Sequence, residues 1–300
     1  MLASNWLTLA KHYEKLTVAG SIPTTLPASA ITDAQYFEVC VAYSPEHIVC
    51  SQAQPAVFTI QSISKLLVLY YILDNYGSLD TVAMHPTTIA YNETDPALFM
   101  ADQKIVNPFI NAGALTLVSM IEGVTMQHKV ERVMAFIAQK FGITTQVDEA
   151  IYAYERTHSQ TNEAICHTLA ALGFLQADVA TTLASYLRLC ALQMTTCDLA
   201  KISYLLQQQR TTDKNIALIE QALLACGLYG ASPLTVNEQP IAAKSGVSGS
   251  IIAYSALPEA HSLAKIGVGI YSPLLNNEGN SAKGYQFLQQ LFALTTEEAY

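Results

Sequence analysis

One short stretch of the chain, QSISKLLVLYYIL (residues 61–73), constrains its fold more than any other. The run from Leu66 to Leu73 is the longest unbroken apolar segment, and it is apolar on every face of a helix. Such a helix belongs inside a large core, because a surface helix keeps one polar face. A chain of 300 residues can supply that core. With eight residues, the run is far shorter than the roughly 20 needed to span a bilayer.

Lys65 is the exception at the head of this helix, three residues after Ser62. Residues three apart lie on one helical face, so the hydroxyl and the amine are expected to meet. Apolar surroundings lower the pKa of a lysine, and a neutral lysine can accept the proton of a serine nucleophile. The helix N-terminus adds N–H groups where negative charge would develop. The alternative is a side chain that reaches to the surface and does no chemistry.

A second motif, AAKSGVSGSIIAY, holds Lys244, Ser245 and Gly246 directly before a strand-like run. SxxK followed far downstream by K-[ST]-G on a strand is the pairing found in serine β-lactamases and penicillin-binding proteins. A glycine there lets a substrate carbonyl approach the backbone, and an N–H at this edge can complete an oxyanion hole. Each motif alone is weak, but their order and context agree. Together they predict a serine acyl-transfer site.

Strand-like segments occur near both ends of the chain, at 36–43, 48–52, 56–60, 248–257 and 265–271. Residues 107–228 read as successive helices, and amphipathic helices are expected at 4–16 and 282–294. Short turns between strands predict antiparallel pairing, so the fold class is α+β. We expect an antiparallel sheet of residues 1–78 and 228–300 flanked by helices, an inserted helical subdomain of residues 79–227, and a site between them.

Three local signals predict where helices begin or end. Pro108 follows Asn107, which predicts a helix beginning there. Thr195 stands three residues before Asp198, an acidic variant of the capping box. Gly77 is expected to end the apolar helix.

Composition excludes several classes of partner and site. The formal charge is −9 with four arginines and no basic stripe, which argues against nucleic acid and anionic membranes. The six cysteines form no CxxC pair and no cluster with the seven histidines, so no metal is expected. The start of the chain does not resemble a secretory signal. Buried free thiols in the cytoplasm are therefore predicted for all six cysteines.

Several stretches resemble the serine-dependent glutaminases, which share the β-lactamase/penicillin-binding-protein-like fold and hydrolyse L-glutamine to glutamate and ammonia. The resemblance covers about residues 18–284, and NPFINAGA beside QSISK is very specific to that family. The matching stretches are FTIQSISK (58–65), NPFINAGAL (107–115), YER (154–156) through Asn162, SYLRLCALQMTTCDLA (185–200), CGLY (226–229), AAKSGVSG (242–249) and GNSAKG (279–284).

The resemblance implies a catalytic role for each of five residues. Ser62 would be the nucleophile and Lys65 its proton acceptor, with Tyr229 in the proton relay. Tyr186 would donate toward the departing ammonia and line the pocket. The N–H groups of Ser62 and Val247 would form the oxyanion hole. No metal or organic cofactor is implied, and the family suggests a homodimer or homotetramer.

The resemblance also implies a binding site for the amino-acid end of glutamine. Glu155 would face the ammonium, Asn111 and Asn162 the carboxylate, and Gln61 would help to hold the substrate. Glutamine is a zwitterion, so one anionic group and several neutral donors suit it. Each residue also has a purely structural interpretation. Asn111 could bond only to backbone within its helix, Glu155 and Asn162 are spaced two turns apart as many pairs are by chance, and most tyrosines are packing residues.

Three stretches depart from the family pattern. Ser21 stands in VAGSIP where the family usually has a tyrosine that closes over the substrate, and 85–88 and 154–162 read HPTT and YERTHSQTN. Losing that tyrosine should weaken substrate retention. Two rival hypotheses therefore remain: a hydrolase of the same fold acting on β-lactams or D-Ala peptides, and a catalytically weakened relative that binds an amino acid or a partner protein. NPFINAGA argues against the first rival, and the retained Ser62 and Lys65 argue against the second.

Overall fold

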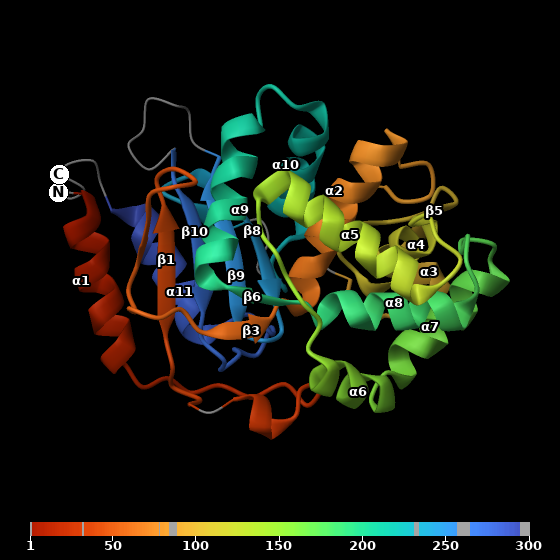
Figure 1. Ribbon diagram of the computed structural model, residues 1–300, viewed down its shortest axis with the longest axis horizontal. Coiled ribbons are helices and arrows are strands. Elements are labelled where there is room, and N and C mark those ends of the chain that lie inside the picture. Colours follow the sequence, from red (N-terminus) through yellow and green to blue (C-terminus); the bar gives the residue numbers. More distant parts are fainter. Residues whose placement is uncertain are drawn as a thin grey trace.

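The computed structural model describes residues 2–31, 33–77, 79–83, 89–230, 234–256 and 265–294. A helix-covered sheet lies beside a mostly helical half (Figure 1). None of the helices in these ranges is long and apolar enough to cross a membrane.

The main sheet has six strands in the order β2-β1-β10-β9-β8-β7, and every neighbouring pair is antiparallel. The strands are β1 (Glu38–Ala42), β2 (Ile48–Cys50), β7 (Thr235–Val236), β8 (Gln239–Gly246), β9 (Ser250–Ser255) and β10 (Gly267–Tyr271). The chain's first and last thirds thus build one sheet, which confirms the predicted α+β class. The predicted strand at 56–60 lies outside it: β3 (Val57–Thr59) pairs with β6 (Gln193–Thr195) instead.

Helices cover both faces of this sheet. Side chains alternate between faces along a strand, and β1 divides accordingly. Val39 and Val41 pack with α1 (Leu2–Lys15) and α11 (Ala282–Ala293), whereas Cys40 and Ala42 pack with Ala200 of α9 (Thr196–Gln209). The α9 helix approaches closely, because a Cβ added at Gly269 would lie 2.1 Å from the Thr196 carbonyl oxygen.

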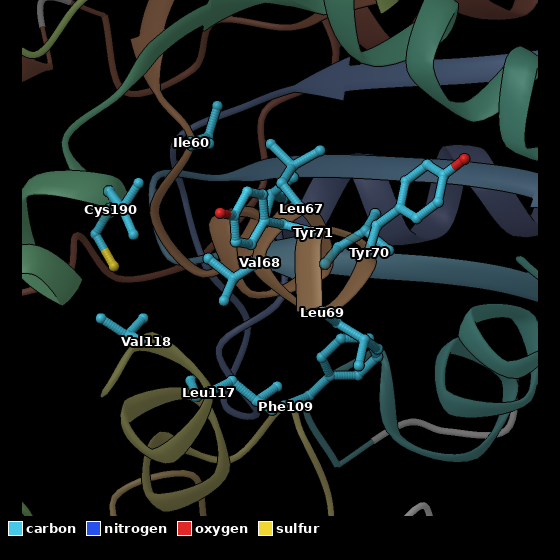
Figure 2. Packing of buried hydrophobic residues seen from close by; sticks show 14 of the residues in the cluster. Ile60, Leu67, Val68, Leu69, Tyr70, Tyr71, Phe109, Leu117, Val118 and Cys190 are labelled. Carbon is cyan, nitrogen blue, oxygen red and sulfur yellow. The ribbon is translucent and has the colours of Figure 1, made fainter. Parts of the chain in front are cut away.

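The helical half surrounds α2 (Ser64–Tyr76), which is buried from Ser64 to Leu73. Its labelled side chains point outward on several sides of the helix, as expected for a central helix (Figure 2). The neighbouring α4 (Asn111–Met120), α5 (Met126–Phe141) and α10 (Lys214–Cys226) pack against it. The remaining elements are η1 (Ala28–Ala30), η2 (Gln61–Ile63), α3 (Pro96–Phe99), β4 (Met100–Ala101), β5 (Lys104–Ile105), α6 (Glu149–Thr157), α7 (Gln160–Ala171) and α8 (Val179–Cys190).

Two of the three local helix signals are confirmed. Gly77 ends α2 in the left-handed conformation, with φ 73°. Thr195 and Asp198 form a reciprocal capping box at the start of α9. The prediction at Pro108 was wrong, because α4 begins at Asn111. The Asn107 side chain instead accepts the N–H groups of residues 109 and 110, both at 2.8 Å, and so closes the turn before the helix.

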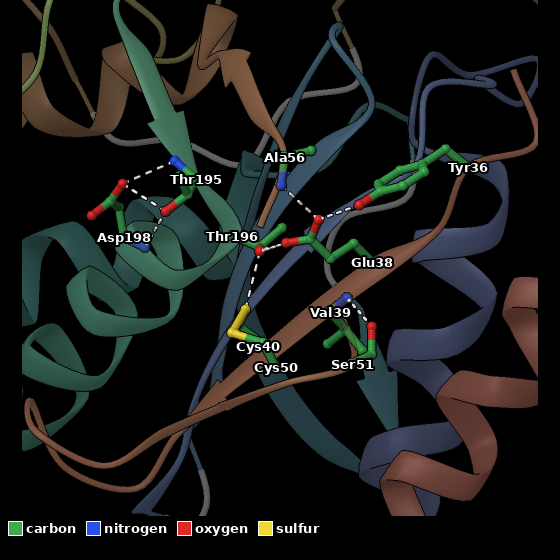
Figure 3. The surroundings of a disulfide bond; sticks show 10 residues. All are labelled: Tyr36, Glu38, Val39, Cys40, Cys50, Ser51, Ala56, Thr195, Thr196 and Asp198. Carbon is green, nitrogen blue, oxygen red and sulfur yellow. Dashed lines mark hydrogen bonds between the residues drawn. A yellow bond between two sulfur atoms is a disulfide. The ribbon is translucent and has the colours of Figure 1, made fainter. Parts of the chain in front are cut away.

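Cys40 and Cys50 form a disulfide bond, so the prediction of free thiols was wrong for this pair (Figure 3). They are direct cross-strand partners in the β1–β2 ladder, with Cα atoms 4.0 Å apart. A search for closely spaced cysteines misses such a pair, since strand register and not sequence spacing brings the two residues together. The other four cysteines are free thiols: Cys166, Cys190 and Cys226 are buried, and Cys197 is half-buried.

Candidate active site

One pocket with a volume of about 440 Å³ gathers the predicted site residues. Its size suits a small-molecule ligand. Lys65 lies buried at 2% exposure and reaches the pocket through a bond to Asn111. The predicted residues in the pocket lining are Gln61, Ser62, Asn111, Glu155, Asn162, Tyr186, Tyr229 and Val247. One cavity therefore receives residues from the 61–63 turn, from five separate helical or turn segments and from the β8–β9 turn.

Ser62 lies in the η2 turn directly before α2, and not within the helix itself. The turn is anchored because Ile60 donates its N–H to the Leu192 carbonyl at 2.9 Å. Gln61 has a φ of 50°, a left-handed conformation that costs energy for a non-glycine residue. Backbone strain next to a buried serine is typical of functional sites, where the surrounding structure enforces it.

The Lys65 amine donates to the Asn111 Oδ1 at 2.5 Å and to the Phe109 carbonyl oxygen at 3.0 Å. Burial lowers its pKa to about 7, and nearby Cys190 opposes that shift. A substantial fraction of Lys65 is therefore neutral near neutral pH. No hydrogen bond joins Lys65 to Ser62 among the described residues, although catalytic hydrogen bonds are often loose before substrate binds.

Two tyrosine hydroxyls lie close to this pair. Tyr186, on α8, donates to the Asn111 Oδ1 at 3.2 Å, and burial raises its pKa well above the ordinary value. Tyr229 lies in the turn after α10, and its hydroxyl makes no hydrogen bond of standard geometry within the described ranges. Burial raises the Tyr229 pKa, and the neighbouring Ser62 hydroxyl partly opposes this effect. Both phenols are thus protonated and able to donate.

The Asn111 side chain connects the two ends of the pocket. Its Oδ1 accepts from Lys65 and Tyr186, while its Nδ2 donates to the Asn162 Oδ1 at 2.8 Å and to the Asn92 Oδ1 at 2.6 Å. These partners are side chains of other segments rather than the backbone of its own helix. The arrangement brings α4 and α7 together at one end of the cavity.

Glu155, on α6, is 7% exposed. Its Oε2 is buried without a hydrogen-bond partner in the described part of the chain. Burial raises its pKa to about 8, and the Gln61 amide opposes that shift. A buried carboxyl with an unused oxygen can bind a cation, which would restore its charged form.

The K-S-G strand lies beside Ser62, the candidate nucleophile, as the paired motifs predict. A Cβ added at Gly246 would lie 2.6 Å from the Ile60 carbonyl oxygen, which shows how closely β8 approaches the turn that carries Ser62. The Asn280 Oδ1 accepts from the Tyr229 N–H at 3.0 Å and from the Ser245 hydroxyl at 2.6 Å. Asn280 therefore fixes a candidate proton donor relative to the strand edge.

A glutaminase family model matches residues 20–300 of the chain. The chain is 31% identical over 287 residues to the glutaminase of Alkaliphilus metalliredigens, covering 91% of each protein. It is 30% identical over 298 residues to glutaminase 2 of Bacillus subtilis, covering 94% of this chain and 93% of the relative. The chain belongs to the glutaminase family. It is accordingly an amidohydrolase, as the resemblance implied.

Solved glutaminase structures confirm the predicted β-lactamase-like fold. A Bacillus glutaminase crystallised in the presence of 4.3 M NaCl superposes with a TM-score of 0.82 at 28% identity, covering 96% of both chains. A probable glutaminase from B. subtilis, complexed with 6-diazo-5-oxo-L-norleucine, has a TM-score of 0.78 at 27% identity, covering 96% of this chain and 92% of that one.

Two of the three departures from the glutaminase pattern can be located. Ser21 is exposed and forms an isolated bridge with Leu275. Within 154–162, the Tyr154 hydroxyl donates to the Thr24 carbonyl at 3.3 Å, so α6 contacts the segment that follows Ser21. The third departure, residues 85–88, lies outside the described residues.

Sequence reasoning missed Tyr91, Asn92 and the role of Asn280. Tyr91 and Asn92 line the pocket from a turn with no helical or strand periodicity, so no sequence pattern marked them. Asn280 lies in a stretch that resembles the family, but nothing there indicated its bonds to Tyr229 and Ser245. Within the described ranges, no group of three or more His, Cys, Asp or Glu side chains could hold a metal ion.

Proposed function

We propose that this glutaminase hydrolyses the side-chain amide of L-glutamine to L-glutamate and ammonia through an acyl-enzyme on Ser62. The observation that carries the proposal is the shared pocket, which brings a buried serine and a lysine network together with a buried carboxyl. This arrangement offers a nucleophile at one end and a partner for an ammonium at the other.

In the first step, the Ser62 oxygen attacks the amide carbon while its proton passes to the neutral Lys65 amine, with Tyr229 in the relay. The developing oxyanion is bound by the N–H groups of Ser62 and Val247. The C–N bond then breaks, and ammonia leaves with a proton from Tyr186, which Lys65 restores. In the second half-reaction, neutral Lys65 takes a proton from the water that attacks the ester and passes it to the Ser62 oxygen as glutamate leaves.

At the other end of the pocket, the substrate ammonium pairs with Glu155. Asn111 and Asn162 face the α-carboxylate, and Gln61 helps to hold the substrate. An analogue without the ammonium or the carboxylate would leave buried polar groups unpaired, and this penalty gives the site its specificity.

The nucleophile is tested by ammonia release from L-glutamine by the native chain and by Ser62→Ala. We expect at least about a thousandfold loss of kcat in the variant, because the acyl-enzyme can no longer form. Ser64→Ala is the matched control: its hydroxyl lies 3.6 Å from the Cys190 sulfur and has no proposed role. Equal loss in both variants, or none in either, would contradict the mechanism.

A weakened amino-acid-binding relative is the remaining rival, because Ser21 replaces an aromatic residue. Calorimetry distinguishes this binding protein from an active glutaminase. A binding protein would give a saturable heat for glutamine without continuing heat of turnover. The β-lactam-hydrolase alternative has lost its basis, because the chain belongs to the glutaminase family.

The assembly and location of the protein remain proposals. A homodimer or homotetramer is expected from the family, and sedimentation velocity would measure it. The cytoplasm is the expected compartment, and four free thiols are compatible with it. The Cys40–Cys50 bond bears on this proposal, because structural disulfides persist mainly in oxidising compartments.

A further inference from the structure

Tyr91 lies against two buried amines that have no charged partner among the residues that the structure describes. Its ring centroid is 5.0 Å from the Lys65 Nζ and 5.3 Å from the Lys244 Nζ. Lys244 donates to the Ser245 carbonyl at 2.8 Å, and Lys65 donates to an amide and a carbonyl oxygen. In the described part of the chain, neither amine takes part in a salt bridge. Aromatic faces therefore add to the stabilisation that these hydrogen bonds give either ammonium.

The position of the Tyr91 ring is fixed from three directions. Its hydroxyl donates to the Cys226 carbonyl at 2.8 Å, at the end of α10. Its backbone carbonyl accepts the Asn111 N–H at 2.9 Å, at the start of α4. Its ring packs edge-to-face on Tyr229, with centroids 4.2 Å apart and an interplanar angle of 73°. One residue thus connects the segments that carry Asn111 and Tyr229.

We propose that Tyr91 is a positioning residue of the active site, whose anchored ring holds Lys65, Lys244 and Tyr229 in place and stabilises a proton on the paired amines. This inference rests on the proposed function, because it assigns the ring's effect to the amine that serves Ser62. Tyr91 acts through these neighbours, because its own hydroxyl is held by the Cys226 carbonyl.

Several ionisable groups face the two amines. Cys190 and Tyr186 approach from α8, Cys226 from the end of α10 and Tyr229 from the turn after it, and Glu155 on α6 raises the pKa of Tyr186 and Cys190. Burial lowers the pKa of Lys244 well below its ordinary value, and Lys65 lowers it further. Two neighbouring ammonium groups repel one another, so it is costly for Lys65 and Lys244 to be protonated together. A ring that contacts both amines therefore influences how readily Lys65 loses its proton.

The ring's electrostatic effect can be reduced without changing its shape. Tyr91→Phe removes the hydroxyl, and successive fluorination of that phenylalanine then weakens the ring quadrupole. We expect the acid limb of kcat, measured with saturating glutamine so that Glu155 is already paired with the substrate, to move to lower pH along the fluorinated series, by about 0.5 to 1 pH unit in total. The matched control is the same series at Tyr70, whose ring lies 5.4 Å from the Lys140 Nζ, and it should leave the acid limb in place.

A second readout is independent of turnover. NMR titration of ¹³C-labelled lysine in the Ser62→Ala chain, with the Lys65 signal assigned by Lys65→Arg, should show the Lys65 pKa falling along the same series. An unchanged Lys65 pKa would overturn the inference, even if the native chain releases ammonia. So would a shift that is complete in Tyr91→Phe and does not grow with fluorination, because the hydroxyl and not the ring would then be responsible. A falling Lys65 pKa in a chain without glutaminase activity would sustain the inference and reject the proposed function.

Discussion

At the scale of single residues, burial shifts the pKa values of two groups, one at each end of the pocket, in opposite directions. Burial lowers the Lys65 pKa to about 7 and raises the Glu155 pKa to about 8. Between these values each group is mostly neutral in the free enzyme. Lys65 is then ready to accept a proton, whereas Glu155 must lose one to pair with the substrate ammonium.

The state of Glu155 predicts how substrate affinity depends on pH. Below pH 8 its carboxyl is largely protonated, so binding a cationic ammonium must displace a proton. We therefore expect KM for glutamine to fall as pH rises from 6 to 8. Glu155→Gln should raise KM by roughly tenfold to a hundredfold, the value of a charge-assisted hydrogen bond, and abolish this dependence. Steady-state kinetics at several pH values measure both effects. A Glu155→Gln chain with the native pH dependence of KM would show that another group receives the ammonium.

The sequence predicted which residues would gather but not how they would bond. The SxxK and K-S-G motifs indicated Ser62, Lys65 and a strand edge. The resemblance to glutaminases supplied the other site residues. Spacing could not indicate that Lys65 would donate to Asn111, 46 positions away, since that contact depends on how α4 packs against α2. Burial of Glu155 was likewise unpredictable, because it depends on the packing of α6 and its neighbours.

At the scale of elements, the site depends on how closely β8 approaches the η2 turn. Gly246→Ala places a Cβ within 2.6 Å of the Ile60 carbonyl oxygen, and only a shift of the strand or the turn relieves that clash. We expect kcat to fall at least about tenfold, because misplacing reactive groups by an ångström or less already costs a large factor. Stability should fall by about 1 to 3 kcal/mol, as in other overpacked cores.

The control for this prediction is Gly269→Ala. Its Cβ would lie 2.1 Å from the Thr196 carbonyl oxygen, at the α9–sheet contact and away from the pocket lining. It should lower the midpoint of urea unfolding, with less effect on kcat in the folded fraction. If the two variants lose kcat in the same proportion to their loss of unfolding free energy, Gly246 has only a packing role.

Element positions follow from local signals more reliably than their packing partners do. The capping box at Thr195 and the glycine at position 77 were predicted because each acts within a few residues. The packing of α9 on the sheet was not predicted, since an amphipathic pattern shows which face is buried but not against what. The cross-strand Cys40–Cys50 pair was missed because the two strand patterns alone do not set which of their residues face each other.

At the scale of the whole molecule, one apolar core extends across the sheet and the helical half. The largest cluster of buried residues includes Ile252 and Tyr271 of the sheet together with Leu69 of α2 and Leu115 of α4. Two subdomains that share a core cannot unfold separately without exposing it. The boundaries at residues 78 and 228 therefore remain a predicted division of the chain, and the shared core makes cooperative unfolding the expectation.

The single tryptophan provides a test of that cooperativity. Trp6 is buried between α1 and the sheet and donates to the Tyr43 hydroxyl at 2.8 Å, so its fluorescence reports on the sheet half. Circular dichroism at helical wavelengths reports mainly on the other half. We expect both urea transitions to have the same midpoint, because the shared core couples the two halves. Phe136→Trp in a Trp6→Phe chain moves the fluorescent probe into the helical half, beside Tyr70 and Tyr71. Two resolved transitions, with the sheet and helical probes following different ones, would show that the subdomains fold independently and that the site forms only when they dock.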